Sequence, residues 1–540
     1  MSLTIPRPRP AGLWALCLWA LAGCTSLPPG AHFPKTPSRV QLAPQDTRLG
    51  THFQSAVTTH GNLSGLRVIS IGVEGFLARI EMINAAERTL DLQYYIFRND
   101  QSGTLIRDAL AQAARRGVQV RILIDDADTL PGDERIFNLA NAPNIEIRVY
   151  NPWAYRGHMK LLRGLEFLTH RSRLDYRMHN KLLVVDDAVA LVGGRNIGDQ
   201  YFQIDPQSQF ADDDVFVTGP TVPELERRFD DFWNSTLAIP SLALEHPKHH
   251  QEHHLPTDDE LSQAGFHYKE KLAAGEPFAG ILSGQTALSW ANTQVVCDSP
   301  DKKDVTHGAR VGSLNYEPIA NAVSSIQQEL LITTPYFVPS NGEMRQLQET
   351  RAREARVAVL TNSLESAPEL SAQAGYMHYR PPLLREGVEL YEVRAKLDST
   401  RGSGQSKRIS DYGNYALHGK IIVFDRKRIY MGSMNFDRRS RFLNTEIGLI
   451  IDSPEISQQM ATRFGAMTQL DSAYTVVAHP GSDDHWSRGS GDVPGGDSMR
   501  LSWKTRERDR VVEYDKEPAR SWWQRVKVHL LSLLPLDSEL

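Results

Sequence analysis

The sequence predicts an α/β fold made of two similar halves related by pseudo-twofold symmetry. Residues 179–196 and 418–435 share the same spacing of polar residues, so the chain contains a long-period repeat. A strand-like run that ends in aromatic residues precedes each copy, at 89–97 and 329–337. Helix-length segments alternate with strand-like runs in both halves, which is typical of βαβ units and a mostly parallel sheet.

The expected elements of the two halves follow one another in the same order. A helical segment precedes each first strand, at residues 76–88 and 319–328. Another helical stretch and a second apolar strand follow, the strands at residues 117–126 and 355–363. Each repeated motif comes next and is predicted as two strands joined by a tight turn.

Composition limits the kinds of partner. Of the 540 residues, 41% are hydrophobic and 23% are charged, which is enough apolar material for a large core. The formal net charge of -5 gives no overall footprint for nucleic-acid binding, so an anionic ligand must be held by a local group of cations. Three cysteines are too few for a disulfide scaffold or a thiolate-rich metal site.

The N-terminus is predicted to be a lipoprotein signal peptide. Arg7 and Arg9 precede an apolar run, residues 11–23, that is too short for an ordinary transmembrane helix. The run ends in "LAGC", which resembles a bacterial lipobox and implies acylation of Cys24, with a plain signal peptide as the alternative. Acyl chains would hold the protein at a membrane surface. Because Thr25 rather than an aspartate follows, the resemblance favours the periplasmic face of the outer membrane over the inner membrane.

We divide the chain into six parts. In order they are the signal peptide (1–23), a tether (24–60), an N-terminal half (61–244) with the first motif (173–200), a linker (245–300), a C-terminal half (301–475) with the second motif (412–439), and a loop with a C-terminal interfacial tail (476–540). The five histidines of residues 245–265 suggest a metal site, but an exposed linker is favoured because nothing apolar nearby would fix a geometry. Residues 477–498 are predicted as a flexible surface loop.

The C-terminal residues 521–540 mix paired tryptophans, basic residues and leucines. Such a composition suits a segment that lies on a bilayer. A helix that docks on the core through Trp522, Val526 and Leu530 is the alternative, and the two interpretations are compatible.

The two motifs have nearly identical spacing, H-x-K-x4-D-x6-G-G-x-N from His179 and H-x-K-x4-D-x6-G-S-x-N from His418. The period of two in a strand places His179 and Lys181 on one face, and the same holds in the second motif. Asp186 and Asp425 have the opposite parity and fall at the turn, so neither is well placed to reach its own histidine. One such motif would indicate only a half-buried histidine beside a solvated lysine, whereas two at matching positions indicate a function.

Both motifs resemble the HKD motif of the phospholipase D superfamily, and the resemblance extends over residues 72–452. Residues 90–103, 115–126 and 178–202 are similar to the bacterial cardiolipin synthase C branch. The resemblance implies two phospholipase D-like βα-sandwich halves with one active site at their interface. It also implies that the catalytic set is His179, Lys181, Asp186, His418, Lys420 and Asp425.

The residue types suit the cleavage of a phosphodiester. Two lysines, together with Asn196, Asn435 and Ser433, could bind the phosphoryl oxygens, so we expect neither a metal nor a cofactor. Gly194 stands where the superfamily commonly has the serine seen at Ser433, so one hydroxyl donor is missing from the first half.

Two histidines suit a covalent route in which one imidazole attacks phosphorus and the other transfers protons. By analogy with the superfamily, His179 is favoured as the nucleophile and His418 as the acid and base. Each histidine needs an acceptor on its second nitrogen, and the candidates on the strands downstream are Asp212 and Glu446, with Asp214 on the same face as Asp212.

The anchor and the interfacial tail favour a membrane phospholipid as the substrate. The leading hypothesis is transfer of a phosphatidyl group to phosphatidylglycerol, which forms cardiolipin, and the resemblance allows phosphatidylethanolamine as the donor. The nearest rival is a phospholipase D hydrolase that releases phosphatidic acid. A nuclease is disfavoured because the chain lacks a basic stripe, and a non-catalytic envelope lipoprotein would be expected to have lost one motif. The sequence leaves open a partner protein and the oligomeric state.

Overall fold

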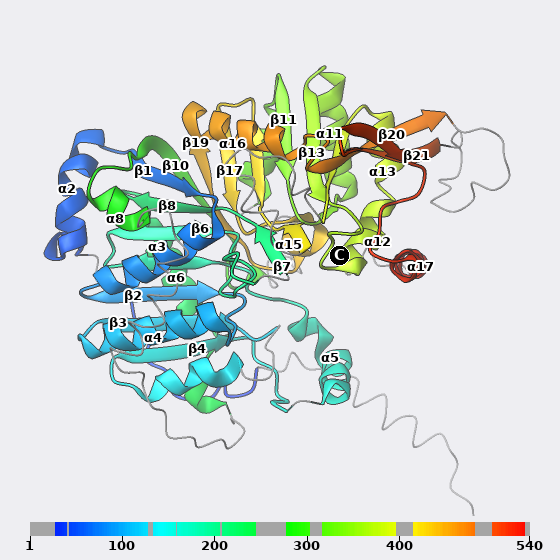
Figure 1. The fold of residues 1–540 in the computed structure, drawn as a ribbon. Coiled ribbons are helices and arrows are strands. Elements are labelled where there is room, and N and C mark those ends of the chain that lie inside the picture. The colour runs from blue at the N-terminus through cyan, green and yellow to red at the C-terminus, as the bar shows by residue number, and fades with distance from the viewer. Residues whose placement is uncertain are drawn as a thin grey trace, which may run out of the picture.

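The structure is a computed structural model that describes residues 28–39, 43–127, 133–157, 159–205, 208–244, 277–302, 316–395, 414–480 and 499–534. Two sheet-and-helix halves lie against each other (Figure 1). The strand order is the same in both, so the predicted α/β fold with two similar halves is confirmed.

The sheet of the first half runs in the order β1-β8-β6-β5-β2-β3-β4-β9. The central strands β2, β3 and β4 are parallel, and every other pair is antiparallel. The strands are β1 (Ser64–Ile69), β2 (Thr89–Tyr94), β3 (Gln119–Asp125), β4 (Ile145–Tyr150), β5 (Leu182–Val185), β6 (Val189–Gly193), β8 (Asp214–Thr218) and β9 (Ala238–Pro240).

The sheet of the second half runs in the order β19-β17-β16-β11-β13-β14-β20-β21-β22. From β19 to β20 this order repeats that of the first half from β8 to β9, with β11, β13 and β14 as the parallel strands. The strands are β11 (Glu329–Thr333), β13 (Arg356–Asn362), β14 (Glu389–Val393), β16 (Ile421–Phe424), β17 (Arg428–Gly432), β19 (Ile447–Asp452), β20 (Ala473–Pro480), β21 (Met499–Glu507) and β22 (Arg510–Tyr514).

Three connections join the halves. Strand β10 (Ser289–Cys297) pairs with β1 on one side and with β19 on the other, so the two sheets are continuous. Strand β7 (Ser208–Ala211) pairs in parallel with β15 (Asn414–Leu417) of the other half. One cluster of buried apolar side chains contains residues of both halves, among them Val184 and Leu449. The halves therefore share a core and cannot separate without exposing it.

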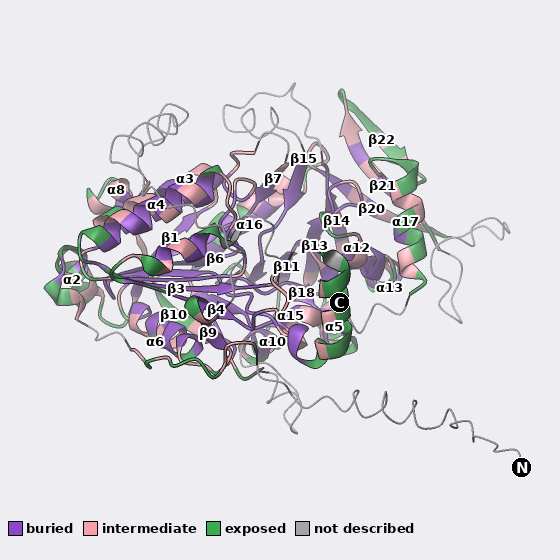
Figure 2. Ribbon diagram, turned by 90° about the horizontal axis from the view of Figure 1, so that it is seen from below, coloured by how far each residue is buried: buried purple, intermediate pink, exposed green. Residues whose placement is uncertain are grey.

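Helices cover the sheets, with their outer faces exposed and the strands buried between them (Figure 2). Their ends carry typical caps, such as Asp100 at the start of α4 and the capping box of Ser340 and Glu343 at α11. The longer helices are α2 (Arg48–His60), α3 (Gly72–Ala85), α4 (Gln101–Arg115), α5 (Lys160–Leu174), α6 (Val222–Trp233), α10 (Tyr316–Ser324), α11 (Asn341–Ala352), α12 (Leu370–Met377), α16 (Pro454–Met467) and α17 (Trp522–Ser532). Shorter pieces are η1 (Pro44–Asp46), η2 (Asp133–Asn141), η3 (Ser241–Ala243), α8 (Pro277–Leu282), α13 (Arg380–Arg385), α15 (Arg438–Phe442), β12 (Phe337–Val338) and β18 (Phe436–Asp437).

Both motifs form the predicted strand–turn–strand unit. Strands β5 and β6 are joined by Asp186 and Asp187, each with φ 54°, and β16 and β17 by Asp425 and Arg426, with φ 51° and 53°. Two successive positive φ values define a type I′ turn, whose twist matches that of the flanking strands. Aspartate tolerates this conformation better than most residues, which explains part of its place in the motif.

Three predicted boundaries differ from the structure. Helix α2 lies inside the expected tether, and its Leu49 and Phe53 belong to the core of the first half. The end of the expected linker is strand β10, which completes both sheets. The last part, residues 476–540, contains β21 and β22 after the predicted loop, and residues 477–480 of that loop belong to β20; residues 245–265 and 481–498 lie outside the described residues. Burial of apolar side chains, rather than local polarity, decides these limits.

The C-terminal helix α17 docks on the second half, but through other residues than predicted. Val528 is fully buried against Leu364 and Ala374, whereas Trp522 and Leu530 are 59% and 60% exposed. Docking through Trp522 and Leu530 was therefore wrong. In the described part of the chain, no helix has both the length and the apolar character that crossing a bilayer requires.

Candidate active site

The two motif histidines lie where the halves meet, and each backbone is held by the opposite half. The amide of His179 donates to the carbonyl of Thr445 at 2.9 Å, next to a parallel bridge between Met178 and Thr445. The amide of His418 donates to the carbonyl of Ala211 at 2.7 Å, at the end of the β7–β15 pair. Both histidines are buried, at 7% and 6% exposure. The contact between halves thus fixes the two imidazoles in one place.

The carboxylate partners cross over between the halves. Nδ1 of His179 lies 2.9 Å from Oε2 of Glu446, which precedes β19 of the second half. Nδ1 of His418 lies 2.6 Å from Oδ2 of Asp212, which precedes β8 of the first half. In both pairs the carboxylate holds Nδ1, so Nε2 is the nitrogen without a carboxylate partner among the described residues. The structure therefore brings Asp212 and Glu446 to the histidines, but each to the histidine of the other motif.

Asp214, the third candidate, turns away from the histidines. Its Oδ2 accepts from Arg79 at 2.8 Å and from Arg195 at 3.0 Å, and all three side chains are buried. A buried carboxylate between two guanidinium groups is electrostatically satisfied and serves the core of the first half.

The two lysines are buried beside the histidines. Nζ of Lys181 donates to the carbonyl of His179 at 2.5 Å, and Nζ of Lys420 donates to the carbonyl of His418 and lies 3.2 Å from the Nε2 atom of that ring. Burial lowers the pKa of Lys181 well below its usual value and that of Lys420 to about 8, because a charged ammonium loses hydration there. An anionic ligand between them would restore their charge.

Burial also lowers the pKa of both imidazoles. That of His179 falls well below 6.5, first through desolvation and then through repulsion by Lys181 and Lys420. That of His418 falls to about 3 for the same first reason, although the charge and hydrogen bond of Asp212 act in the opposite direction. Both rings are therefore neutral in the empty site, and the carboxylate of Asp212 favours the protonated form of His418.

The two carboxylates differ in their own acidity. Burial raises the pKa of Glu446 to about 7, in spite of Lys181. The pKa of Asp212 is lowered in spite of its burial, because His418, Lys420 and Arg195 surround it with positive charge. The pairs are thus unequal electrostatically, and Asp212 is the one that stays ionised.

This difference predicts opposite pH dependences of stability. The folded-state pKa of Glu446 is raised, so its contribution is present at low pH and lost as pH rises through about 7. We expect the free energy of unfolding of the unmodified protein, relative to Glu446→Gln, to fall by on the order of 1–3 kcal/mol between pH 5 and 8. Asp212→Asn is the matched variant, and the free energy of unfolding of the unmodified protein relative to it is expected to fall only as the pH drops below the usual carboxyl range. Urea denaturation at a series of pH values measures both, and equal slopes for the two variants would contradict the assignment.

The motif asparagines are equivalent in position but not in bonding. Oδ1 of Asn196 accepts from the amide of Ile96 at 3.2 Å. Oδ1 of Asn435 is buried and has no hydrogen-bond partner within the described residues. The unpaired oxygen of Asn435 can accept from a hydroxyl of a ligand, whereas a phosphoryl oxygen needs the amide NH2 group of either asparagine.

Ser433, expected to bind a phosphoryl oxygen or to orient a neighbour, contacts a carboxylate. Its hydroxyl donates to Oε2 of Glu446 and accepts from the amide of Ile447, and it is fully buried. These contacts fit the orienting role, because Glu446 is the carboxylate that holds His179. In the first half a Cβ on Gly194 would lie 2.0 Å from Oδ1 of Asp212. The carboxylate of Asp212 therefore occupies the space that a serine side chain at position 194 would need.

A serine at position 194 should consequently harm the site. We expect Gly194→Ser to reduce turnover at least ~100-fold, because its Cβ would displace Asp212 from His418. Ser433→Ala removes a hydroxyl without adding an atom and is expected to lower turnover by no more than ~10-fold. Steady-state kinetics on the two folded variants would measure the difference, and an active Gly194→Ser enzyme would contradict this account of the motif asymmetry.

Asp186 and Asp425, grouped with the catalytic residues, are placed differently by the structure. Asp186 accepts hydrogen bonds from the amides of residues 87, 88 and 89, at 2.7–3.0 Å. Asp425 accepts from the amides of residues 327, 328 and 329, at 2.8–3.0 Å. Each carboxylate thus fastens its hairpin turn to the chain entering β2 or β11, and the grouping with reacting residues is corrected.

Replacement of Asp186 should cost stability instead of chemistry. We expect Asp186→Ala to lower the free energy of unfolding by about 2–4 kcal/mol, since three amides lose a charged acceptor. Asp425→Ala, the matched variant of the second half, should behave alike. Chemical denaturation measures the loss of stability, and turnover per folded molecule should stay within ~10-fold of that of the unmodified protein. A far larger loss of turnover with unchanged stability would show that the aspartate takes part in the reaction.

Aromatic rings complete the surroundings of the histidines. Tyr95 meets His179 edge to face at 4.9 Å between ring centroids. Phe210 stacks on His418 at 5.2 Å, and Tyr201 meets it at 5.1 Å. Tyr201 and Phe210 were not singled out from the sequence, although both lie in segments that were.

A buried ion pair that sequence reasoning missed supports Glu446. Its amide donates to Oδ2 of Asp298 at 3.0 Å, and Nζ of Lys302 bonds the same atom at 3.0 Å and the carbonyl of Ser440 at 2.8 Å. Asp298 and Lys302 are 2% and 3% exposed. Their local sequence, a polar run after β10, contains no signal of this role.

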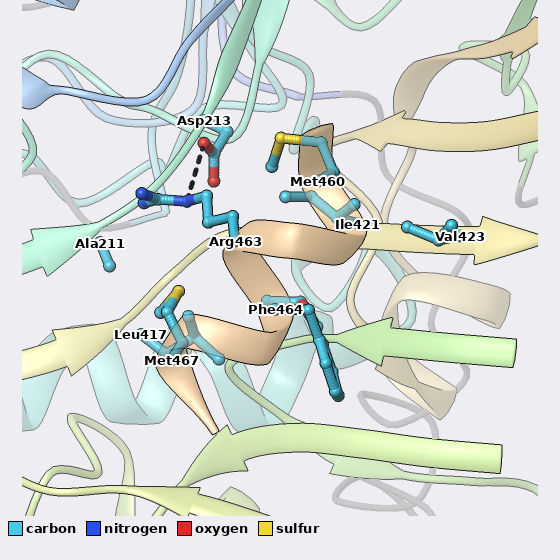
Figure 3. A pocket seen from close by; sticks show the side chains of 10 residues that line it. Ala211, Asp213, Leu417, Ile421, Val423, Met460, Arg463, Phe464 and Met467 are labelled. Carbon is cyan, nitrogen blue, oxygen red and sulfur yellow. Dashed lines mark ion pairs between the residues drawn. The ribbon is translucent and has the colours of Figure 1, made fainter. Parts of the chain in front are cut away.

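A second ion pair, between Asp213 and Arg463, lies next to Asp212 where the halves meet. Asp213 points toward Arg463 of α16, with 3.5 Å between Oδ1 and Nε, and Met460, Phe464 and Met467 line the small cavity beside them (Figure 3). The pair ties the strand that carries Asp212 to the second half.

Two halves that each supply a histidine and a lysine, and a carboxylate for the other half's histidine, define a two-motif enzyme of the phospholipase D class. The family described as "Cardiolipin synthase, PLD-like domain" matches residues 79–233 and 319–468, one match in each half. The chain belongs to this family.

Two individual relatives, both cardiolipin synthases, agree with this assignment. Cardiolipin synthase C of Escherichia coli strain K12 is 34% identical over 91% of this chain and 99% of its own length. The major cardiolipin synthase of Bacillus subtilis strain 168 is 26% identical over 76% of this chain and 69% of its own. The crystal structure of phosphatidylserine synthase from Haemophilus influenzae Rd KW20 matches with a TM-score of 0.49 and 15% identity, over 79% of this chain and 92% of that one.

Proposed function

We propose that the protein is a phosphatidyltransferase that makes cardiolipin from phosphatidylglycerol and a second phospholipid through a phosphohistidine intermediate. The crossed histidine–carboxylate pairs are the observation that carries the chemistry, because each half holds Nδ1 of the other half's histidine and the charges of Lys181 and Lys420 act on both rings. The extent of the likeness to cardiolipin synthase C supports the substrate class.

In the first step, Nε2 of His179 attacks the phosphorus of the donor lipid. The bond between phosphorus and the headgroup oxygen breaks, and His418 gives a proton to that oxygen, because the bound phosphodiester anion and Asp212 together favour its protonated form. Lys181 and Lys420 balance the charge on the phosphoryl oxygens, with Asn435 and Asn196 as further donors. The product is a phosphatidyl group bound to His179 and a free alcohol.

In the second step, His418 takes the proton of a hydroxyl of phosphatidylglycerol. The oxygen attacks phosphorus, and the bond to His179 breaks, so that cardiolipin forms and both imidazoles return to their initial states. Asp212 supports this assignment of roles, because it favours the protonated form of His418, as an acid requires.

Incubation of the detergent-solubilised protein with radiolabelled phosphatidylglycerol and phosphatidylethanolamine, followed by lipid chromatography, tests the function. Labelled cardiolipin is expected. Phosphatidic acid without cardiolipin would favour the hydrolase instead, and digestion of DNA in a parallel assay would favour a nuclease.

We also propose that Cys24 is acylated and anchors the protein to the outer membrane, facing the periplasm. Cys24 lies outside the described residues, and the proposal rests on "LAGC" and on the preceding apolar run. Mass spectrometry of the mature N-terminus and fractionation of the membranes test it: an unmodified cysteine, or recovery in the inner membrane, would contradict it.

A further inference from the structure

Large hydrophobic side chains at the surface are concentrated on two helices. Five exposed ones belong to α5 and the residue before it, namely Met159, Leu161, Leu162, Leu165 and Leu168. Five more belong to α17 and the residues after it, namely Trp522, Trp523, Leu530, Leu533 and Leu534. Elsewhere in the described residues only Phe33, Ile71, Leu242 and Val511 are of this kind. A soluble surface scatters such residues singly, so the two groups indicate a partner.

On α5 the exposed leucines form one stripe. Leu161, Leu165 and Leu168 follow the i, i+4, i+7 spacing of one helix face and are 70%, 51% and 74% exposed. The opposite side is attached to the protein: Phe167 packs on Trp153, and Glu166 accepts from the amides of residues 154 and 155. The stripe is therefore presented outward by a helix that is fixed from behind.

Helix α17 is presented in the same way. Val528 is buried, and the side-chain amide of Gln524 donates to the carbonyl of Leu364 at 2.7 Å. Trp522 and Trp523 stack on each other at 4.0 Å between ring centroids and remain 59% and 57% exposed. A tryptophan pair at a helix start is well suited to the boundary between water and lipid.

Both helices stand at the edge of the sheets where the motif histidines lie. His179 precedes β5, whose Leu182 pairs with Gln93 near the carboxyl end of β2, and α5 follows the carboxyl end of the parallel strand β4. In the second half Ile421 pairs with Thr333, the last residue of β11, and α17 packs on α12, which follows β13. Figure 1 shows α5 and α17 on the same side of the molecule, α5 below α17.

The charge around the stripes selects the partner. Helix α17 contains Arg525, Lys527 and His529 and no acidic residue. The one acidic residue of α5, Glu166, is turned inward, whereas Arg171 is 48% exposed on that helix. Cations beside exposed leucines and tryptophans match an anionic lipid surface, where apolar side chains enter the acyl region and the cations meet phosphates.

We propose that α5 and α17 form a two-point docking surface for an anionic phospholipid bilayer, one helix from each half, which holds the edge bearing His179 and His418 against the membrane. The inference rests on the proposed function for its substrate, but the docking is a property of the surface alone. Seated in this way, the site would take lipids from the leaflet without their passing through water.

The test places an environment-sensitive fluorophore on cysteines introduced into the full-length protein. Leu168→Cys reports on α5, Leu530→Cys on α17, and Val511→Cys, an exposed site on β22, is the matched control. With vesicles of phosphatidylglycerol and phosphatidylethanolamine, we expect a blue shift at 168 and 530 and none at 511, after subtraction of the label on the unsubstituted chain. No shift at 168 and 530, or an equal shift with vesicles of phosphatidylcholine alone, would overturn the proposal.

Turnover separates this inference from the proposed function. We expect Leu165→Glu combined with Leu168→Glu to lower cardiolipin formation on vesicles at least tenfold and to leave it unchanged in detergent micelles, with Val511→Glu unaffected in both. Equal activity of the double variant on vesicles would overturn the docking surface. Absence of cardiolipin from the unmodified protein in both media would instead count against the proposed function, while the fluorescence result would stand.

Discussion

Replacement of either motif histidine by alanine is expected to lower cardiolipin formation at least ~1,000-fold. His179→Ala removes the atom that would bond to phosphorus, and His418→Ala removes the group that protonates the leaving oxygen. Both rings are buried and fixed by the opposite half, so no other histidine can take their place in the structure described. Radiolabelled phosphatidylglycerol and lipid chromatography measure the loss.

His52→Ala is the control for this pair, because His52 is exposed on α2, at the outer edge of the first half and away from the contact between the halves (Figure 1). It should leave turnover unchanged. After a rapid quench, peptide mapping under non-acidic conditions should locate the radiolabelled phosphatidyl group on His179 of the unmodified protein. Full activity of either histidine variant would reject the two-histidine scheme, and label on His418 would exchange the two roles.

Loss of the crossed carboxylates has the second largest expected effect. Asp212→Asn and Glu446→Gln keep the size of the side chain but remove the charge that faces Nδ1, and we expect each to lower turnover by ~100-fold to ~10,000-fold. Each carboxylate holds the histidine of the other half, so each variant should slow the step in which that histidine reacts. Glu446→Gln should slow formation of the intermediate on His179.

Asp212→Asn should affect the pH dependence more strongly, because it removes the group that favours protonated His418. Its rate of intermediate formation is expected to fall more steeply toward alkaline pH than that of Glu446→Gln. Asp213→Asn, next in the chain and paired with Arg463, is the control for a general disturbance of this junction. If Asp212→Asn and Asp213→Asn have equal effects on turnover, Asp212 serves only to hold the two halves together and does not act on His418.

Local patterns in the sequence were sufficient for much of this structure. The repeated strand–helix order predicted two equivalent sheets, and the polar pairs at 186–187 and 425–426 predicted the turns of both hairpins. Parity also placed Asp186 and Asp425 away from the histidines, because side-chain direction alternates with every residue of a strand. These features depend on neighbours in the chain.

The remaining features depend on how the halves pack. Periodicity gives the face of a strand on which Asp212 or Glu446 lies, but it does not say which histidine approaches that face. The same limit applies to Ser433, which meets a carboxylate, and to Lys302, whose partners lie in a different segment. Nor does local sequence show that α2 and β10 belong to the core and the sheets, because the polar segments around them led us to predict a tether and a linker.

The sequence by itself determined the duplicated α/β fold, the two histidine–lysine pairs and the turns that present them. Only the tertiary structure decided that each histidine is oriented from the opposite half, that Gly194 makes room for Asp212, and that α5 and α17 carry their apolar stripes at the edge of the site. The physical reason is that hydrogen-bond partners across an interface are selected by the burial of a shared core, and this burial brings together residues that no local pattern connects.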